Sequence, residues 1–398
     1  MVAAGAAGPG RLAALLDPIG VDEFFARYRD REHVVVHRGE PKRYADLVDL
    51  AGVESYIFET NPRSSDLQVL HEGPVDRAEY VYPSGLVDAL ALSRLYEEGH
   101  SIVLPHAHLH LASLGYLVRG LEAELGCRAQ TNLYLSPPGA AAFAPHYDTH
   151  DVLVLQAHGE KEWTLYEGPA PVPSTRRFDP EVDDCGDPVE TFTLAAGDVC
   201  YVPRGLVHRA AATTGASLHV TLGVHWVTVL DVLTAVLEGA GAERHDLHRS
   251  LPPGWWRDPA DRDAARTAVA DALAGLAATP LLDGAFDALR TDLVRTRQPL
   301  VPGQLDQLRH LDLIDQHTRV APRDPMVHDL REEDGRVVLS CFGSEIAFPS
   351  STLPALARLL GAGPDGVVVG DLPGDLDGEE RLVLVRRLVR EGTLVARW

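Results

Sequence analysis

The chain has 398 residues, of which 45% are hydrophobic and 24% charged, so it is long enough for two or three globular domains with a sizeable core. No apolar run approaches the ~20 residues of a membrane span. The 58 acidic and 36 basic residues give a net charge of -22, which argues against nucleic acid as a partner and would suit a basic protein or peptide. An acidic surface that serves only solubility is an equally good interpretation.

The N-terminal segment MVAAGAAGPGR has no basic stretch followed by an apolar one, so residues 1–11 predict a short disordered leader and a cytoplasmic protein. The four cysteines, Cys127, Cys185, Cys200 and Cys341, are far apart and form no C-x-x-C pair. Reduced, structural thiols are therefore favoured over a disulfide framework or a zinc ribbon.

The first third of the chain predicts helices with one short strand. A helix that opens near Asp22 carries aromatic residues, and the run His33–His37 alternates as a strand does. Residues 84–128 predict two helical pieces, and Gly126 ends the second. That second piece has leucine and valine at spacings of three and four, at Leu114, Leu117, Val118 and Leu121.

From about residue 129 to 226 the apolar period changes from that of a helix to two. The short β-branched and aromatic runs are QTNLYLS, DVLVLQ, EWTLYE, ETFTL, DVCYVP and SLHVTLGVHW, separated by Gly, Pro and Asp. Gly197-Asp198 predicts a tight turn between two of these strands. Such a series with no helical pattern between its members indicates an antiparallel barrel or jelly roll.

Residues 227–300 return to a helical pattern. Two apolar stripes are present, one at Val269, Leu273 and Leu276 and the other at Phe286, Leu289 and Leu293. Between helices, LPPGWWRDP interrupts the pattern with two tryptophans, Trp255 and Trp256, which we expect to pack against a neighbouring chain.

From about residue 313 the chain predicts a third, small unit. VVLSCF and EIAF are expected strands, STLPALARLL is an expected helix, and Asp377 and Glu380 predict a capping box for a helix that runs through Arg390 and ends at Gly392. Helices with a short β-ribbon suggest a winged-helix-like module. The arginines of the last helix are interpreted as a solvated face.

His146, Asp148 and His208 are the candidate metal ligands. Residues two apart on a strand point to the same face, so His146 and Asp148 of the H-Y-D motif can chelate one ion. His208, expected in a loop after a barrel strand, supplies the second imidazole. Two histidines and one carboxylate are the facial triad of non-haem Fe(II).

Two further polar residues belong to the same cavity by their position on neighbouring strands. Lys161 lies among apolar residues and is expected to act as the cation for a buried carboxylate, because an unpaired ammonium there would be costly. Asn132 can donate and accept hydrogen bonds into the cavity. A metal triad with a deep lysine is what 2-oxoglutarate requires.

The motifs N-x-Y-x-S-P-P-G, H-Y-D, D-V-L-V-L-Q, G-E-K-E-W, G-D-V-x-Y-V-P-R-G-x-x-H and S-L-H-V-T occur in this order. Their combination resembles the JmjC-type cupin family (cupin superfamily 4), which contains the ribosomal oxygenases. The similarity is densest over about residues 100–230, and the layout of the rest of the chain is similar as well.

The resemblance implies Fe(II) at His146, Asp148 and His208, with Lys161 pairing the distal carboxylate of the co-substrate 2-oxoglutarate. It further implies O2 as oxidant, Asn132 beside the co-substrate and Tyr134 beside the substrate. Some relatives have a serine where this chain has Gly223, so we expect a hydroxyl contact to be missing or replaced by water.

The predicted fold class is therefore α+β, with four segments. A leader (1–11) precedes a double-stranded β-helix, the JmjC/cupin jelly roll (12–228). A helical region suited to homodimerisation (229–312) and a winged-helix-like domain (313–398) follow.

The predicted function is a 2-oxoglutarate-dependent dioxygenase that hydroxylates a protein side chain, with a ribosomal protein favoured as the substrate. Alternatives are a hydroxylase tailoring a ribosomally made peptide, N-methyl demethylation by the same chemistry, and a metal-binding cupin scaffold without oxygenase activity. Of the other histidines, His219 is expected to be buried and hydrogen-bonded. His106, His108 and His110 are expected to form a polar strand or a helix-entry face without a metal.

Overall fold

A boundary between Trp226 and Val227 divides the chain into two units. The computed structural model describes residues 10–168, 178–179, 183–276 and 279–398. Most of the predicted leader lies outside these residues, and Arg11, its last residue, begins the first helix. The predicted four-segment division by residue number stays a prediction. No single helix in the described ranges is long and apolar enough to cross a membrane, although the helical stretches Pro259–Leu276 and Pro280–Thr296 pass that test together as a bent pair.

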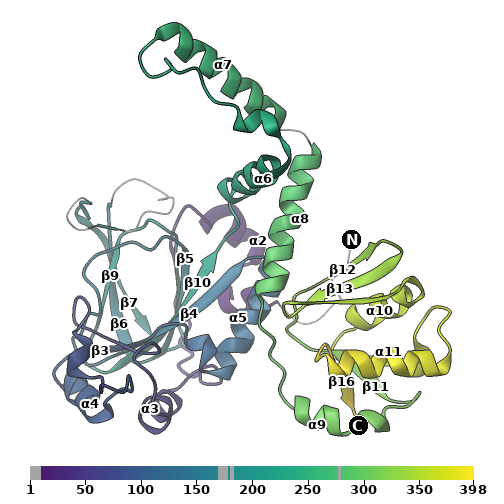
Figure 1. Ribbon diagram of the computed structural model, residues 1–398. Helices are drawn as coiled ribbons and strands as arrows, with labels where there is room; N and C mark the ends of the chain where they lie inside the picture. The colour runs from purple at the N-terminus through teal and green to yellow at the C-terminus, as the bar shows by residue number, and fades with distance from the viewer. Residues whose placement is uncertain (1–9, 169–177, 180–182, 277–278) are drawn as a thin grey trace. The chain divides into compact units, whose positions relative to one another are not determined.

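A seven-stranded antiparallel sheet forms the larger wall of the first unit (Figure 1). Its spatial order is β1-β8-β5-β10-β4-β3-β2. The strands are β1 (Val34–Val36), β2 (Gln68–Leu70), β3 (Ser101–Leu104), β4 (Arg128–Ser136), β5 (Asp151–His158), β8 (Val199–Val202) and β10 (Ser217–His225). β10 lies between β4 and β5, and its Thr221 is opposite both Asn132 and Val154.

A three-stranded sheet of order β7-β6-β9 forms the smaller wall. Its strands are β6 (Glu160–Tyr166), β7 (Pro188–Ala195) and β9 (His208–Ala212). Trp163 and Leu194 of this sheet pack with Val152, Val154 and Val202 of the larger one, so the two sheets face each other across a shared apolar layer. The predicted antiparallel jelly roll is confirmed.

Helices and short turns cover the other face of the large sheet. They are α1 (Arg11–Leu16), α2 (Val21–Glu23), η1 (Phe24–Tyr28), α3 (Leu50–Glu59), η2 (Arg77–Glu79), α4 (Ala89–Glu97), η3 (Ala107–Leu109) and α5 (Ala112–Leu125). α5 buries Leu114, Leu117, Val118 and Leu121, and the left-handed Gly126 ends it, as predicted.

The two helical pieces predicted in residues 84–128 are confirmed as α4 and α5, but the prediction missed β3 (Ser101–Leu104), which lies between them. All four residues of β3 are buried. A short, continuously apolar run has no period of its own, so it cannot be told from a buried part of a helix by pattern alone.

The second unit begins with helices. They are α6 (Val229–Glu243), η4 (His245–His248), α7 (Pro259–Leu276) and α8 (Thr279–Thr296). Thr228 and Asp231 form a capping box at the start of α6, and Val236, Ala240, Leu276 and Ala285 make a small shared core. The segment with Trp255 and Trp256 interrupts the helices as predicted, and both indoles are exposed.

Two three-stranded sheets and further helices complete this unit (Figure 1). The sheet orders are β15-β11-β16 and β12-β13-β14. The strands are β11 (Arg319–Pro322), β12 (His328–Glu333), β13 (Arg336–Cys341), β14 (Ser344–Pro349), β15 (Val367–Val368) and β16 (Leu394–Arg397). The helices are α9 (Gln304–Arg309), η5 (Leu311–Leu313), η6 (Ser350–Thr352), α10 (Leu353–Leu360), η7 (Val369–Asp371) and α11 (Gly378–Arg390).

The capping box of Asp377 and Glu380 and the extent of α11 agree with the prediction. β11, β12, β15 and β16 were not predicted. β15 has only two residues, too few to show a pattern. β12 has the sequence HDLREE, and its charged residues obscure the alternation of a strand because β12 is only partly buried.

Candidate metal centre and its pocket

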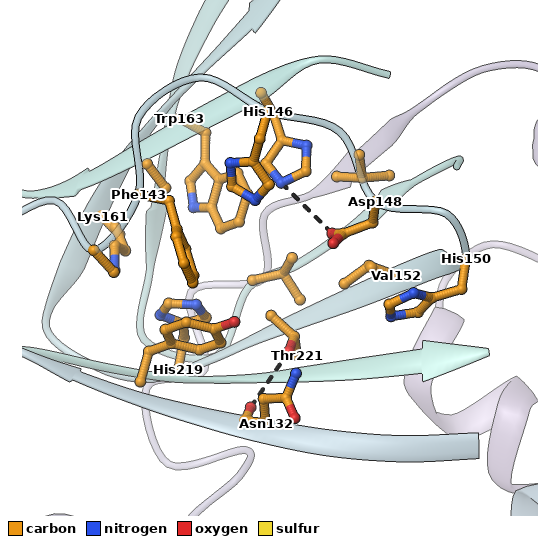
Figure 2. A pocket seen from close by; sticks show the side chains of 16 residues that line it. Asn132, Phe143, His146, Asp148, His150, Val152, Lys161, Trp163, His219 and Thr221 are labelled. Atoms are coloured by element: carbon orange, nitrogen blue, oxygen red, sulfur yellow. Dashed lines mark hydrogen bonds and ion pairs between the residues drawn. The ribbon is translucent and has the colours of Figure 1, made fainter. Parts of the chain in front are cut away.

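A cavity lies between the two sheets of the first unit (Figure 2). Strands β4, β5, β6, β8, β9 and β10 contribute to its lining, together with the segment between β4 and β5. All six site residues predicted from the sequence line it, namely Asn132, Tyr134, His146, Asp148, Lys161 and His208. The fold therefore brings together side chains that are up to 76 positions apart in the sequence, from Asn132 to His208.

His146, Asp148 and His208 form one cluster, with one possible ligand atom from each within 4.8 Å of the others. His208 Nε2 lies 3.8 Å from the Asp148 carboxylate, and the two imidazole centroids are 4.7 Å apart. Two backbone hydrogen bonds between His146 and His208, of 2.8 and 3.1 Å, hold the two segments together.

The local structure around these ligands differs from the prediction. His146 and Asp148 lie in an irregular segment before β5, joined to β9 by isolated bridges at Ala141 and His146, and not on a regular strand. His208 is the first residue of β9 and not part of a loop. The side chains still converge, because the bridge fixes His146 opposite His208 and Asp148 follows two residues later.

Both imidazoles are oriented by backbone carbonyls. His146 Nδ1 lies 2.9 Å from the Ala144 oxygen, and His208 Nδ1 lies 3.0 Å from the Leu206 oxygen. A proton on each Nδ1 donates to its carbonyl and leaves Nε2 with a free lone pair, which is the form that binds a metal. Burial, and then the nearby His146, lowers the pKa of His208 to about 4, so this imidazole is neutral near pH 7.

Lys161 lies at the other end of the cavity and is only 1% exposed. Its ammonium donates to Ser136 Oγ at 3.1 Å, and Ser101 donates to the same oxygen at 2.9 Å. No carboxylate among the described residues lies within ion-pair distance of it. Burial lowers the pKa of Lys161 to about 7. An anion bound here would therefore pair with the Lys161 ammonium, whose charge no carboxylate of the described residues balances.

His219 adds a second unsatisfied group near Lys161. Its Nδ1 is buried without a hydrogen-bond partner in the described part of the chain, and its ring stacks on Tyr134 at 4.7 Å. Burial, and then the charge of Lys161, lowers the pKa of His219 well below its usual value. The expectation of a buried histidine is correct, while the expected hydrogen bond is not seen at Nδ1 among the described residues.

Asn132 and Tyr134 lie two positions apart on β4, and both line the cavity. Asn132 Oδ1 accepts a hydrogen bond from the His106 backbone at 3.1 Å, so part of its polar capacity is already used. Burial, and then the charge of Asp148, raises the pKa of Tyr134, so this side chain stays a neutral hydroxyl. Figure 2 shows Asn132 beside Thr221 below the cavity.

Phe143 and Thr221 line the cavity but were not singled out from the sequence. The Phe143 ring lies 5.1 Å from that of His146 and 6.3 Å from that of Tyr134. The sequence feature that could have identified Phe143 is that it is the one aromatic residue in the run GAAAFAP, three positions before His146. Thr221 gave no signal beyond the alternation of β10.

The place beside Gly223 is taken by His150. A Cβ on Gly223 would lie 2.5 Å from two atoms of the His150 ring, closer than any side chain tolerates. His150 lines the cavity and stacks on His225, with centroids 4.6 Å apart and planes at 17°. The glycine therefore admits an imidazole, where the sequence predicted only a missing hydroxyl or a water.

Comparison with known proteins places these observations in a family. Residues 115–232 match the JmjC domain. The bifunctional lysine-specific demethylase and histidyl-hydroxylase NO66 of Drosophila grimshawi is 31% identical over 255 residues, which are 62% of this chain and 35% of that protein. Human ribosomal oxygenase 1 is 27% identical over 96% of this chain and 67% of its own length.

Solved structures show the same fold. YcfD, a ribosomal oxygenase from Escherichia coli in complex with cobalt and succinic acid, superposes with a TM-score of 0.57 and covers 96% of this chain and 99% of YcfD at 17% identity. YcfD with cobalt and 2-oxoglutarate gives a TM-score of 0.54 at 16% identity over the same shares of the two chains.

The chain spans about a third of the NO66 protein that it matches in Drosophila grimshawi, and about two fifths of the NO66 protein of Aedes aegypti. Its match to human ribosomal oxygenase 1 and to the YcfD fold nevertheless extends over nearly all of its own residues. Residues 115–232 are therefore a JmjC domain, and the similarity of this chain to the JmjC-type cupins that include the ribosomal oxygenases is confirmed.

Proposed function

We propose that this chain is an Fe(II)- and 2-oxoglutarate-dependent oxygenase that hydroxylates a side chain of a protein, with a ribosomal protein as the favoured target. One observation carries the proposal. The cavity holds a cluster of two histidines and a carboxylate at one end and the buried ammonium of Lys161 at the other. The similarity of the chain to human ribosomal oxygenase 1 supports the same choice.

The donor set fits iron. Two neutral imidazoles and one carboxylate are the facial triad, which leaves positions on a non-haem Fe(II) for other ligands. His146 Nε2, His208 Nε2 and an oxygen of Asp148 would hold the ion. When bound, iron with 2-oxoglutarate and O2 supplies the oxidising chemistry that hydroxylates a C–H bond.

The lysine end fits the distal carboxylate of the co-substrate. Lys161 supplies the positive charge, and Ser136 orients the ammonium through its hydroxyl. The unsatisfied His219 Nδ1 is a further hydrogen-bonding group on the same lining. The two ends thus fit a dicarboxylic acid that reaches from the metal to the lysine, with Asn132 beside it and Tyr134 toward the substrate.

The remaining lining excludes water. Val152, Val154 and Trp163 are buried and form an apolar wall, and Phe143 lies near His146 at the side of the segment before β5. Such a wall keeps the dielectric constant low around the charges, and the buried indole N–H of Trp163, which has no hydrogen-bond partner among the described residues, is a further donor on it.

A protein substrate is favoured over a small molecule. The net charge of -22 would attract a basic protein, and ribosomal proteins as a class carry many lysines and arginines. The same charge disfavours direct binding to nucleic acid. A peptide product of the ribosome and an N-methylated side chain would be accepted by the same chemistry, and they are outcomes of the experiment below. We also propose a cytoplasmic location.

The second unit is proposed to contain a dimerisation region and a winged-helix-like module. On α6, Val229, Leu230, Leu233 and Leu237 are at least half exposed at spacings that place them along one side of the helix. An apolar stripe of this kind normally meets a partner. Light scattering of the double variant Leu233→Glu with Leu237→Glu tests it, because a homodimer built on α6 would dissociate, whereas an unchanged mass would contradict this role.

The function is tested by intact-mass spectrometry of ribosomal proteins from cells that lack this gene, after treatment with the protein, Fe(II), 2-oxoglutarate and O2. We expect one protein to gain one oxygen atom, with no gain when Asp148→Ala is used. Succinate without any gain on a protein would direct the search to small peptides. Neither product would favour a metal-binding cupin that is not an oxygenase.

A further inference from the structure

A groove of about 1290 Å³ lies in the second unit, between the edge strand β14 and helix α11, with η6 also lining it. We call it the β14–α11 groove. Residues 345–349 of β14 all line it, although neighbouring residues of a strand point to opposite faces of the sheet. The groove therefore follows the edge of the strand, where main-chain groups are accessible, and not one of its faces.

The turn before β14 fixes which main-chain groups face the groove. β13 and β14 are joined by Phe342 and Gly343, both with positive φ (51° and 73°), as in a two-residue type I′ hairpin. Cys341 and Ser344, which close this turn, are directly opposite each other. In such a hairpin the closing pair exchanges both of its hydrogen bonds.

Hydrogen-bonded and non-bonded pairs alternate along an antiparallel ladder. Ile346 and Phe348 therefore bond to β13, whereas Glu345 and Ala347 turn their N–H and C=O groups outward. Among the described residues, β14 has no second neighbouring strand. An open edge of this kind can accept the main chain of an extended segment.

The side chains of the groove add an apolar floor and an acidic rim. The apolar side chains are Ile346, Phe348, Leu376, Val383 and Leu384, of which Val383 is 62% exposed. The charged side chains are Glu345, Asp377, Glu379, Glu380 and Arg387. Arg387 already pairs with Glu391 at 2.7 Å, and Glu345 with Arg331 at 2.9 Å. The rim therefore presents three carboxylates without a cationic partner among the described residues, those of Asp377, Glu379 and Glu380, of which Asp377 and Glu380 also cap α11.

We propose that the β14–α11 groove binds an extended segment of a partner protein in which lysine or arginine alternates with apolar residues. Main-chain bonds to Glu345 and Ala347 would add the segment as a further strand. Its apolar side chains would then face the floor and its basic ones the rim. Phosphate-rich partners are repelled by the same carboxylates. This site is separate from the metal centre, and binding to it requires neither metal nor co-substrate.

The test is fluorescence anisotropy of the full chain, free of metal, with a labelled peptide of alternating lysine and valine. We expect saturable binding that weakens as salt is raised, because the rim charges are exposed. A peptide of alternating glutamate and valine should not bind. Equal binding of the two peptides, or stronger binding of a single-stranded oligonucleotide, would overturn the proposal.

Variants locate the binding. Val383→Glu puts a charge in the floor, and Ala347→Pro removes an outward N–H without taking a bond from β13. We expect each to weaken binding by about tenfold or more. Circular dichroism melting confirms that each variant is folded, and normal binding by both folded variants would contradict the assignment.

A matched pair isolates the rim charge. Glu379→Gln and Glu332→Gln remove the same charge, but Glu332 lies on β12 at the opposite edge of the sheet. The peptide should bind less tightly to the first variant only. An equal loss in both would mean that only the overall charge is sensed. Self-association that Val383→Glu abolishes would mean that a second copy occupies the groove, and the proposed partner would be wrong.

Discussion

The two ends of the pocket in the first unit are constructed differently. The metal end consists of an irregular segment that carries His146 and Asp148 and of the first residue of β9, and the Asp148 side chain remains 34% exposed. The lysine end consists of residues inside regular strands, where Lys161 and Ser136 are buried. At the metal end, ligands that exchange and a substrate chain need access from solvent. At the lysine end, a carboxylate of the co-substrate is bound most strongly where water is excluded.

The largest effect is expected at the metal end. Asp148→Ala removes the only carboxylate of the cluster, and we expect iron affinity at neutral pH to fall by more than about 100-fold, since even an outer-shell partner of a metal ligand is typically worth 10–100-fold. Metal titration followed by succinate formation measures the loss. Asp46→Ala, an exposed aspartate of the same unit, is the control. Full activity of Asp148→Ala would contradict the triad.

At the lysine end a different step should fail. Lys161→Met keeps the length of the side chain but removes its charge, and we expect 2-oxoglutarate binding to weaken by about 2–5 kcal/mol while metal binding is retained. Calorimetry of the Mn(II)-loaded protein separates the two. A metal-binding scaffold would show no 2-oxoglutarate binding to lose, and an unchanged affinity would remove Lys161 from the site.

The pH dependence of co-substrate binding follows from the buried ammonium. Because burial lowers the pKa of Lys161 to about 7, its charged form is lost as the pH rises through that value. The affinity for 2-oxoglutarate should then fall by up to about tenfold per pH unit above 7, until the pKa of the bound state is reached. Lys161→Arg, which stays charged, should bind with little pH dependence. An equal slope for both proteins would assign the titration to another group.

The smallest effect is expected beside the metal end, at Gly223. Gly223→Ser places a Cβ where the His150 ring lies, so the imidazole must leave its stack on His225. Neither residue belongs to the proposed ligand set, so metal and co-substrate affinities should change by less than about threefold. The preference among peptide substrates should change. A large loss of iron affinity would show that His150 supports the metal ligands directly.

The sequence predicted the lysine end better than the metal end for a physical reason. Asn132 and Lys161 lie in strands whose alternation is visible in the letters, so both could be assigned to the cavity from the sequence, whereas Tyr134 was assigned through the family resemblance. The H-Y-D segment is irregular, and its geometry depends on isolated bridges to β9, at Ala141 and His146, that no local pattern encodes.

Phe143 and His150 illustrate what requires the folded chain. Phe143 contacts the site from an irregular segment, and the place of His150 depends on the absent side chain of Gly223 on a different strand. The β14 edge also illustrates this limit. Its strand was predicted, but the groove needs α11, which lies about thirty residues later in the chain and is brought near by the shared core of the second unit.

The most direct test of the central claim is an anaerobic titration of 2-oxoglutarate into the Fe(II)-loaded protein, followed by the visible charge-transfer absorption that a chelated 2-keto acid produces. The unmodified protein should give a saturable band. The band should need far more 2-oxoglutarate in Lys161→Met and should be absent in Asp148→Ala. A protein that binds Fe(II) but gives no band at saturating 2-oxoglutarate would contradict a joint iron and co-substrate site.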